Sequence, residues 1–135
     1  MDMKTIISAK RKTAVAKLRL TTGSGKVFFN HLPATELTLF HKLALAEPLR
    51  VYDAELGEPL KVDFYIKTHG GGREAHIQAA RLALARALVH ISGSETLKKA
   101  FAKYDRTMIV QDSRRKEAAK PGDSSARSKR QKSYR

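Results

Sequence analysis

The last 23 residues, 113–135, constrain this chain most, because they cannot form a hydrophobic core. They carry nine Lys and Arg residues against two acidic residues, and they include no Val, Ile, Leu, Met or Phe. Such a segment buries too little apolar surface to offset the entropy of ordering its backbone, so alone it should be disordered. Its net charge of +7 is half of the chain's +14. A flexible cationic arm is typical of proteins that bind RNA or DNA, although a solubilising tail would have the same composition.

The remaining residues, 1–112, are enough for one modest domain. The chain has no cysteine, so neither disulfides nor thiolate metal sites stabilise the fold. Its apolar stretches are far shorter than the ~20 residues that a membrane span needs, and Met1–Lys4 lack the apolar region of a signal peptide. We therefore expect a cytoplasmic protein without a membrane partner, with a globular domain at 1–112 and an extended basic arm at 113–135.

Alternation of apolar and polar residues predicts the strands. Residues 13–20 alternate between an apolar side and a side that carries Lys17 and Arg19. The glycine-containing turn at 21–25 predicts a hairpin in which residues 26–30 form the returning strand. Residues 60–67 alternate again, and residues 107–110 are expected to form a short final strand.

Apolar residues at helical spacing predict the helices. Residues 35–46 have this spacing, and Pro48 predicts two short helical pieces around it. Residues 73–91 predict a long amphipathic helix, with Ser92 and Ser94 as competing caps of the helix that follows. This order predicts an α+β fold: a two-layer α/β sandwich with a mixed four-stranded sheet, helices on one face, and an extended basic C-terminal tail.

Two glycine-rich segments resemble anion sites to different degrees. Residues 23–26 resemble the end of a nucleotide-binding P-loop, but Val27 stands where that motif needs Ser or Thr, so a glycine turn is the better interpretation. Residues 70–72 directly precede the long helix, whose free N–H groups favour a phosphate, and Arg73 adds charge. A loop with positive φ angles would require the same glycines.

A second basic block, residues 10–12 followed by Lys17 and Arg19, lies beside a predicted strand. It predicts a nucleic-acid face, with a solvated surface as the alternative. The five histidines show no metal-like spacing, and no pair of carboxylates or nucleophile stands in a catalytic context. We expect no enzymatic activity, no metal, no cofactor and no small-molecule substrate.

Four motifs then carry a resemblance: KRKTAVAK at 10–17, the glycine loop running into QAARLALARAL at 78–88, YDRT at 104–107 with DSRR at 112–115, and KRQKSYR at 129–135. In this order and spacing, the chain closely resembles the small-subunit ribosomal protein nine family. The QKSYR ending is similar to the archaeal and eukaryotic cytosolic branch, whereas the bacterial branch ends in a shorter Ser-Lys-Arg.

The resemblance implies a structural protein in the head of the small ribosomal subunit that binds small-subunit rRNA beside neighbouring head proteins. It also implies that the arm reaches the peptidyl-site tRNA, where Tyr134 could stack on a base or ribose. The residues expected to bind rRNA are Lys10, Arg11, Lys12, Lys17, Gly70, Gly71, Gly72, Arg73, Arg114, Arg115, Lys116, Lys120 and Arg127. Those expected to contact tRNA are Lys129, Arg130, Lys132, Tyr134 and Arg135. A free-standing nucleic-acid-binding module and a nucleotide-using enzyme are the alternatives.

Overall fold

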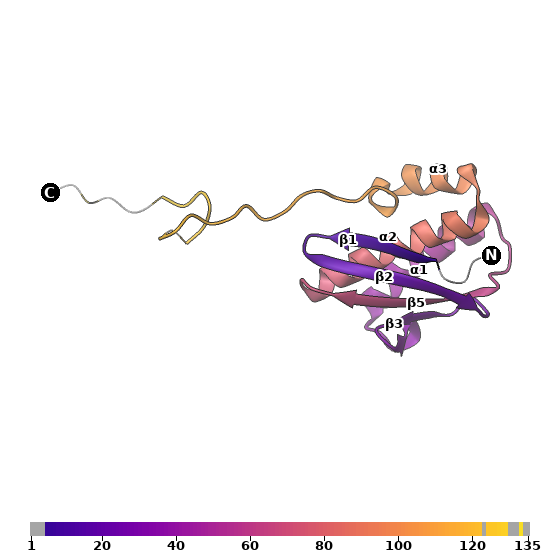
Figure 1. Cartoon of the computed structure of the whole chain (residues 1–135). Helices are drawn as coiled ribbons and strands as arrows, with labels where there is room; N and C mark the ends of the chain where they lie inside the picture. Colours follow the sequence, from indigo (N-terminus) through magenta and orange to yellow (C-terminus); the bar gives the residue numbers. More distant parts are fainter. Residues whose placement is uncertain (1–4, 123, 130–132, 134–135) are drawn as a thin grey trace.

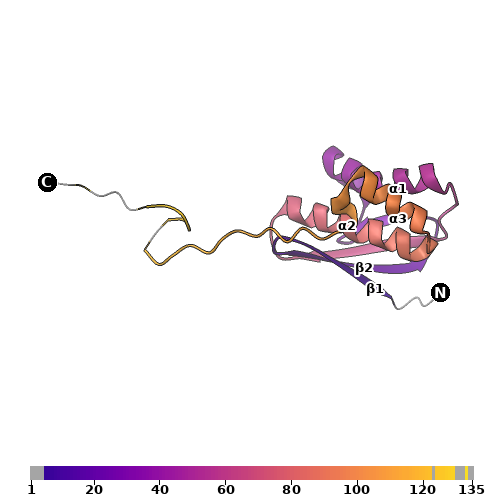
Figure 2. The same cartoon turned by 90° about the horizontal axis from the view of Figure 1, so that it is seen from above.

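The computed structural model describes residues 5–122, 124–129 and 133. The strands and helices, which lie between Ile6 and Met108, form two layers, and the described residues of the arm extend away from them (Figure 1). One layer is a mixed sheet with the strand order β1-β2-β5-β3-β4. The helices cover a single face of this sheet, as Figures 1 and 2 show from two directions. The strands are β1 (Ile6–Arg11), β2 (Ala14–Thr22), β3 (Val27–Phe29), β4 (Leu32–Pro33) and β5 (Val62–His69), and the helices are α1 (Leu39–Glu55), α2 (Arg73–Ser92) and α3 (Glu95–Tyr104).

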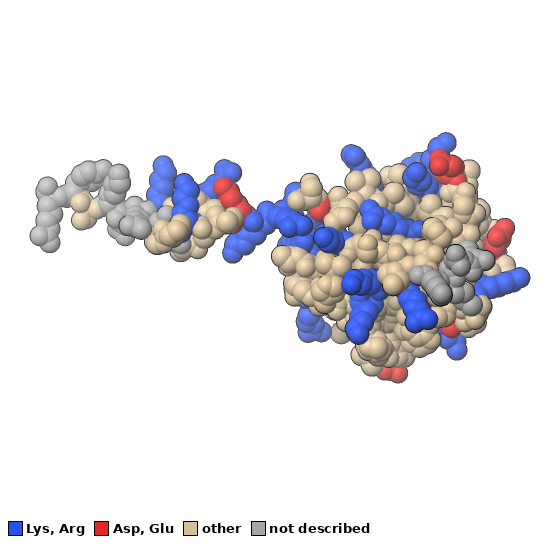
Figure 3. Space-filling view, viewed as in Figure 1, with Lys and Arg blue, Asp and Glu red and all other residues tan. Residues whose placement is uncertain are grey.

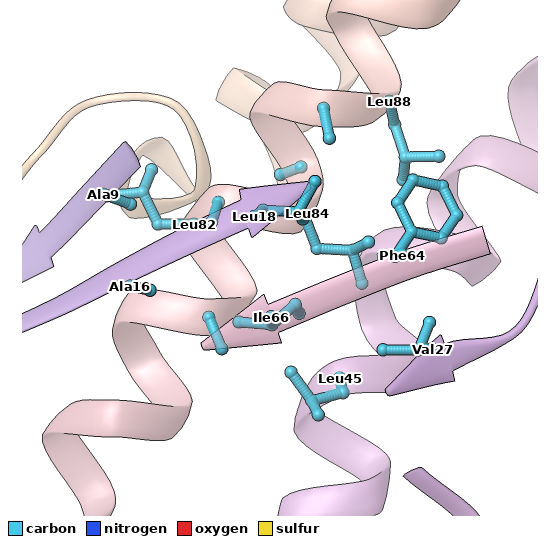
Figure 4. Close-up of a cluster of buried hydrophobic side chains, with 14 of the residues drawn as sticks. Ala9, Ala16, Leu18, Val27, Leu45, Phe64, Ile66, Leu82, Leu84 and Leu88 are labelled. Atoms are coloured by element: carbon cyan, nitrogen blue, oxygen red, sulfur yellow. The ribbon is translucent and has the colours of Figure 1, made fainter. Parts of the chain in front are cut away.

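The hydrophobic core lies between the sheet and α2. Leu18 of β2 and Phe64 of β5 point from the sheet toward Leu84 and Leu88 of α2. Leu45 of α1 belongs to the same buried cluster (Figure 4). All five side chains are buried. The small side chains of the α2 alanines allow the neighbouring elements to pack close to this helix. As a result α2 is buried on nearly every side.

The α+β class, the two layers and the helices on one face are confirmed, but the sheet has five strands where four were expected. Residues 107–110 form no strand. Instead Arg106–Met108 make a 3₁₀ turn, because the Asp105 carboxylate accepts hydrogen bonds from the Thr107 amide and hydroxyl at 2.8 Å. The additional strands are β1 and β4.

The predicted hairpin between 13–20 and 26–30 is wrong in its pairing. β5 lies between these strands, antiparallel to β2 and parallel to β3. β3 pairs instead with β4 across Asn30 and His31, whose φ angles of 47° and 73° fit a two-residue turn. The Asn30 side chain also accepts from the Thr68 amide at 2.8 Å and donates to its hydroxyl at 2.9 Å, which fixes this turn against β5.

The predicted break at Pro48 is also wrong, since α1 runs through it as one helix of 17 residues. Pro48 is buried on the same face as Leu45 and Tyr52, so packing against the rest of the domain offsets the lost helical hydrogen bond. At the start of α3, Ser94 is the cap, and its hydroxyl accepts from the Leu97 amide at 3.4 Å.

Candidate nucleic-acid interface

The predicted glycine loop packs against the turn between β1 and β2. Gly70 and Gly71 both have φ angles of +72°, and a Cβ atom on them would lie 2.8 Å from the Thr13 carbonyl oxygen and 2.9 Å from the Ala14 amide nitrogen. The His76 ring nitrogen Nε2 lies 2.5 Å from the Gly70 carbonyl oxygen. These two glycines are therefore required by the fold itself.

Gly72 differs from its two neighbours. Its φ of −100° suits any residue, and nothing lies within 4 Å of the position that its Cβ would take. It caps α2 without any side-chain hydrogen bond to the first turn. The N–H groups of that turn and the exposed Arg73 thus border an open surface, and the exposed Lys12 belongs to the turn between β1 and β2 against which Gly70 and Gly71 pack.

Arg11 connects this end of the domain with the start of the C-terminal arm. Its guanidinium Nη1 lies 2.7 Å from Asp112 Oδ2, and its Nε donates to Gln78 Oε1 at 2.8 Å. Asp112 also accepts from Arg114, through the backbone amide at 2.8 Å and through Nη2 at 2.9 Å. Of the cations expected to bind rRNA, Arg11 and Arg114 are therefore already engaged within the protein.

These contacts stabilise the charged form of Asp112. Hydrogen bonds from the Arg114 side chain and amide, together with the nearby Arg11 charge, lower the pKa of the Asp112 carboxyl to about 2. The same interaction raises the pKa of the Arg114 guanidinium. The carboxylate is consequently ionised throughout the physiological range.

Arg81 of α2 holds the segment that leads to the arm. Its guanidinium pairs with Glu47 of α1 and, through Nη1, with Asp105 Oδ2 at 2.9 Å. Only 18% of the Arg81 side chain is exposed. Burial alone would raise the pKa of Asp105, but hydrogen bonds from Thr107 and the Arg81 guanidinium hold it below its ordinary value.

Arg86, one and a half turns further along α2, completes this network. It donates to the Ile109 carbonyl oxygen at 3.1 Å and to the Ser8 carbonyl oxygen at 3.3 Å. The motifs at 10–17, 78–88, 104–107 and 112–115 therefore meet at the place where the arm leaves the domain (Figure 1). Several residues of these motifs are therefore explained by their contacts at this junction.

Six further cations of the domain are exposed, and none of these six forms an ion pair with a described residue. Four were expected from the sequence, namely Lys10, Lys12, Lys17 and Arg73. Two more face outward, as strand alternation indicates: Arg19 of β2, which belongs to the second basic block, and Lys67 of β5, which was not expected to bind rRNA. Figure 3 shows Lys and Arg side chains gathered on this outward face of the sheet.

The described part of the arm is similarly exposed. Arg115, Lys116, Lys120 and Lys129 are exposed, whereas Arg127 Nε pairs with Glu117 Oε2 at 3.0 Å. The predictions for Arg130, Lys132, Tyr134 and Arg135 lie outside the described residues.

Other acidic residues interact within the domain. Asp53 and Glu58, at the end of α1 and in the loop after it, add to burial in raising the pKa of Tyr52. Asp63 accepts from the Ser24 and Lys26 amides at 2.8 and 2.9 Å. The turn at 23–26 thus binds the protein's own carboxylate, which confirms that it is a glycine turn and not a phosphate loop.

Groups that could hold a metal ion do not come together in the described ranges. Within them, no three His, Cys, Asp or Glu side chains are placed to share a metal ion. His41 instead contacts Glu74, with 2.9 Å between Nε2 and Oε1. None of the helices in these ranges is long and apolar enough to cross a membrane.

Comparison of the sequence with known proteins found a matching family and similar relatives. The family described as "Ribosomal protein S9/S16" matches residues 9–135. The chain is 44% identical over 131 residues to the "Small ribosomal subunit protein uS9" of Saccharolobus solfataricus, covering 96% of this chain and 94% of the relative. It is 40% identical over 129 residues to the protein of the same name from Methanococcus vannielii, covering 93% and 94%. Both relatives are archaeal, which agrees with the resemblance of the C-terminal residues to the archaeal and eukaryotic cytosolic branch.

Proposed function

Because this chain belongs to the ribosomal protein S9/S16 family, we propose that it is a component of the small-subunit head that binds rRNA and contacts the peptidyl-site tRNA. Membership itself makes the chain a structural ribosomal protein and not an enzyme. The finer proposal rests on one observation: exposed cations that form no ion pair with a described residue occur on the domain and again in the arm, at Arg115, Lys116, Lys120 and Lys129. We further propose that it works in the cytoplasm as a globular domain at 1–112 and an rRNA-binding arm at 113–135.

On the domain, the open surface around Gly72 is the best candidate for an rRNA phosphate. The free amides of α2, Arg73 and Lys12 can each donate to phosphate oxygens. Gly72→Val would block the approach of a phosphate while retaining the fold, at a cost of about 1 kcal/mol for the poorer cap. Gly71→Val would not test the proposal, since it forces a side chain into a +72° φ angle and against the Ala14 backbone.

The proposal is tested by measuring how well variants are incorporated into small subunits. Folded Gly72→Val and Arg73→Gln variants should be under-represented when they compete with the unaltered protein during subunit reconstitution. Lys99→Gln, on exposed α3, is the charge-matched control and should incorporate normally. Equal incorporation of all three variants would contradict the phosphate site.

The arm is proposed to supply most of the electrostatic affinity. If residues 113–135 make about five to eight phosphate contacts, their deletion should flatten the plot of log K against log salt concentration by roughly 0.7–0.9 per contact. Binding of the complete and truncated chains to rRNA fragments at several salt concentrations gives this slope. An unchanged slope would show that the arm does not contact phosphate in that complex.

The end of the arm is proposed to contact tRNA through Lys129, Arg130, Lys132, Tyr134 and Arg135. Deleting residues 132–135 should leave subunit assembly nearly intact, because most cations lie before this point. It should speed the dissociation of peptidyl-site tRNA modestly, since a few exposed phosphate contacts contribute about 1–3 kcal/mol. Equal dissociation rates from normally assembled subunits would show that residues 132–135 do not contribute to tRNA binding.

A further inference from the structure

The outward face of the sheet carries a row of side chains that neither the core nor the arm junction uses. Strand register aligns Ile6 of β1, Arg19 of β2, Tyr65 of β5 and Phe28 of β3 across it. The helices lie on the opposite face, so this row is uncovered in the described structure (Figure 2). We propose that this face binds an unpaired RNA nucleotide, with the base on the aromatic rings and its phosphates on the surrounding cations.

The aromatic part of the row is a parallel stack. The ring centroids of Phe28 and Tyr65 are 4.7 Å apart and their planes differ by 8°. Tyr65 remains 43% exposed, whereas its neighbours Phe64 and Ile66 point into the core. Exposed rings on an open sheet can stack with an unpaired nucleobase without regard to sequence.

The rings border a hollow whose charged lining is entirely cationic. Its side chains include Lys17, Arg19, Lys67 and His31 beside the two rings, and among the described residues no carboxylate lines it. The nearest acidic position along β5, Asp63, is engaged by the amides of the 23–26 turn. A phosphate would therefore meet three permanent positive charges around one aromatic stack.

The register also places Lys17 and Lys67 directly opposite each other. Like charges in opposed positions destabilise a sheet. In the described residues neither lysine has an acidic partner that would relieve the repulsion. A bound phosphate between them would remove this cost, which is a physical reason for the pair to face RNA.

Charge also favours RNA over protein at this face. By contrast, the exposed hollow formed by Phe40, Leu43 and Tyr104 includes Glu47 as well as Arg50, and a mixed apolar surface of that kind suits a protein neighbour. The sheet face favours single-stranded RNA over a duplex, because paired bases do not present their faces to a side chain. The inference rests on the proposed rRNA function, which supplies the RNA, but it concerns a different surface from the Gly72 site and the arm.

The first test measures RNA affinity of the full chain in solution. A short fluorescent oligouridine is the single-stranded probe, and a blunt-ended RNA duplex of equal charge is the paired probe. Tyr65→Leu and Phe28→Leu keep the surface apolar but remove the ring stack, and each should weaken oligouridine binding at least about 5-fold while leaving duplex binding unchanged. Tyr104→Leu, an exposed aromatic on α3, is the control. Unchanged oligouridine affinity in both folded sheet variants would overturn the inference.

The second test identifies the occupant in the assembled particle. A photoreactive phenylalanine analogue in place of Tyr65 should crosslink to small-subunit rRNA after incorporation. Crosslinks to a protein alone, or none from normally incorporated chains, would overturn the inference without affecting the proposed ribosomal function. If the chain failed to enter subunits at all, the proposed function would fail, and the oligouridine measurement would still decide the sheet face.

Discussion

Two sets of cations on this domain carry the same charge but have opposite surroundings. Arg11, Arg81 and Arg86 are partly buried and bound to carboxylates or carbonyl oxygens at the junction with the arm. Lys17, Arg19 and Lys67 stand exposed on the open sheet, without an acidic partner in the described residues. A net charge of +14 therefore overstates what is available to RNA, because part of the positive charge holds the protein together.

The chemistry of each set fits its surroundings. The planar guanidinium donates several hydrogen bonds in fixed directions, so one arginine can join two or three segments. Arg81 does this for α1, α2 and the turn after α3. In the exposed set, the flexible, strongly hydrated ammonium groups of Lys17 and Lys67 suit a surface that adjusts to phosphates, and the guanidinium of Arg19 can bind a phosphate through two parallel hydrogen bonds. The two sets thus separate a structural role from a binding role, and four measurements test that separation.

The largest expected effect on stability is that of Arg81→Gln. The substitution leaves Glu47 and Asp105 without their shared cation, and we expect a loss of about 2–3 kcal/mol, below the value for a fully buried pair because the site is partly exposed. Urea unfolding measures the loss. The affinity of the folded variant for oligouridine should not change; a stable variant with weakened RNA binding would place Arg81 in the binding set instead.

Arg86→Gln should have a smaller effect of the same kind. It removes hydrogen bonds to the Ile109 and Ser8 carbonyl oxygens, and we expect a loss of about 1 kcal/mol. Hydrogen exchange at residues 109–112 should increase, because this segment loses one of its attachments to α2. Unchanged exchange there, together with unchanged stability, would contradict the role given to Arg86.

Lys67→Gln should act in the opposite direction. Removing one of two opposed lysines relieves repulsion, so stability should stay the same or rise by about 0.2–0.5 kcal/mol. Oligouridine affinity should fall, and the salt slope should decrease by about 0.7 if one phosphate contact is lost. Lys99→Gln serves as the control for both measurements. A destabilised variant with normal RNA affinity would show that Lys67 belongs with the structural cations.

The smallest expected effect is the acid titration of Asp112. The pKa of its carboxyl is lowered from the ordinary 3.8 to about 2, so its contribution is fully present above pH 3.8 and is lost as pH falls toward 2. An NMR titration of the carboxyl carbon gives the midpoint. In Arg114→Gln the midpoint should move up toward 3.8. A midpoint near 3.8 in the unaltered chain would mean that the Arg114 contact does not form in solution.

The sequence predicted the local elements better than their partners. The helix expected at 73–91 is observed at Arg73–Ser92, because a long apolar period is a local signal. The turn at 23–26 was also expected, but the pairing of β3 with β5 depends on a strand that begins 35 residues after Val27. Residues 107–110 have strand-like composition, yet they form no strand, because the Asp105 side chain caps a 3₁₀ turn at Arg106–Met108.

The candidate site was predictable in composition and much less in geometry. The basic stretches and the glycine loop were recognised, but the ion pair that joins Arg11 to Asp112 links residues 101 positions apart and leaves no local signal. Alternation did place Arg19 and Lys67 outward. Alternation does not predict strand register, however, and it is the register that aligns Arg19 with the Tyr65 ring and places Lys67 opposite Lys17.

The central place of β5 has a consequence for how the chain is made. Residues 62–69 fill the middle of the sheet, yet they are the last of its strands to be synthesised. Until they emerge, β2 presents an open edge with Ala16, Leu18 and Leu20 exposed beside it, and such edges promote aggregation. Lys17 and Arg19 alternate with these apolar residues and place charge on that same strand. The cations proposed to hold RNA in the finished protein would therefore also protect the nascent chain while its sheet is incomplete.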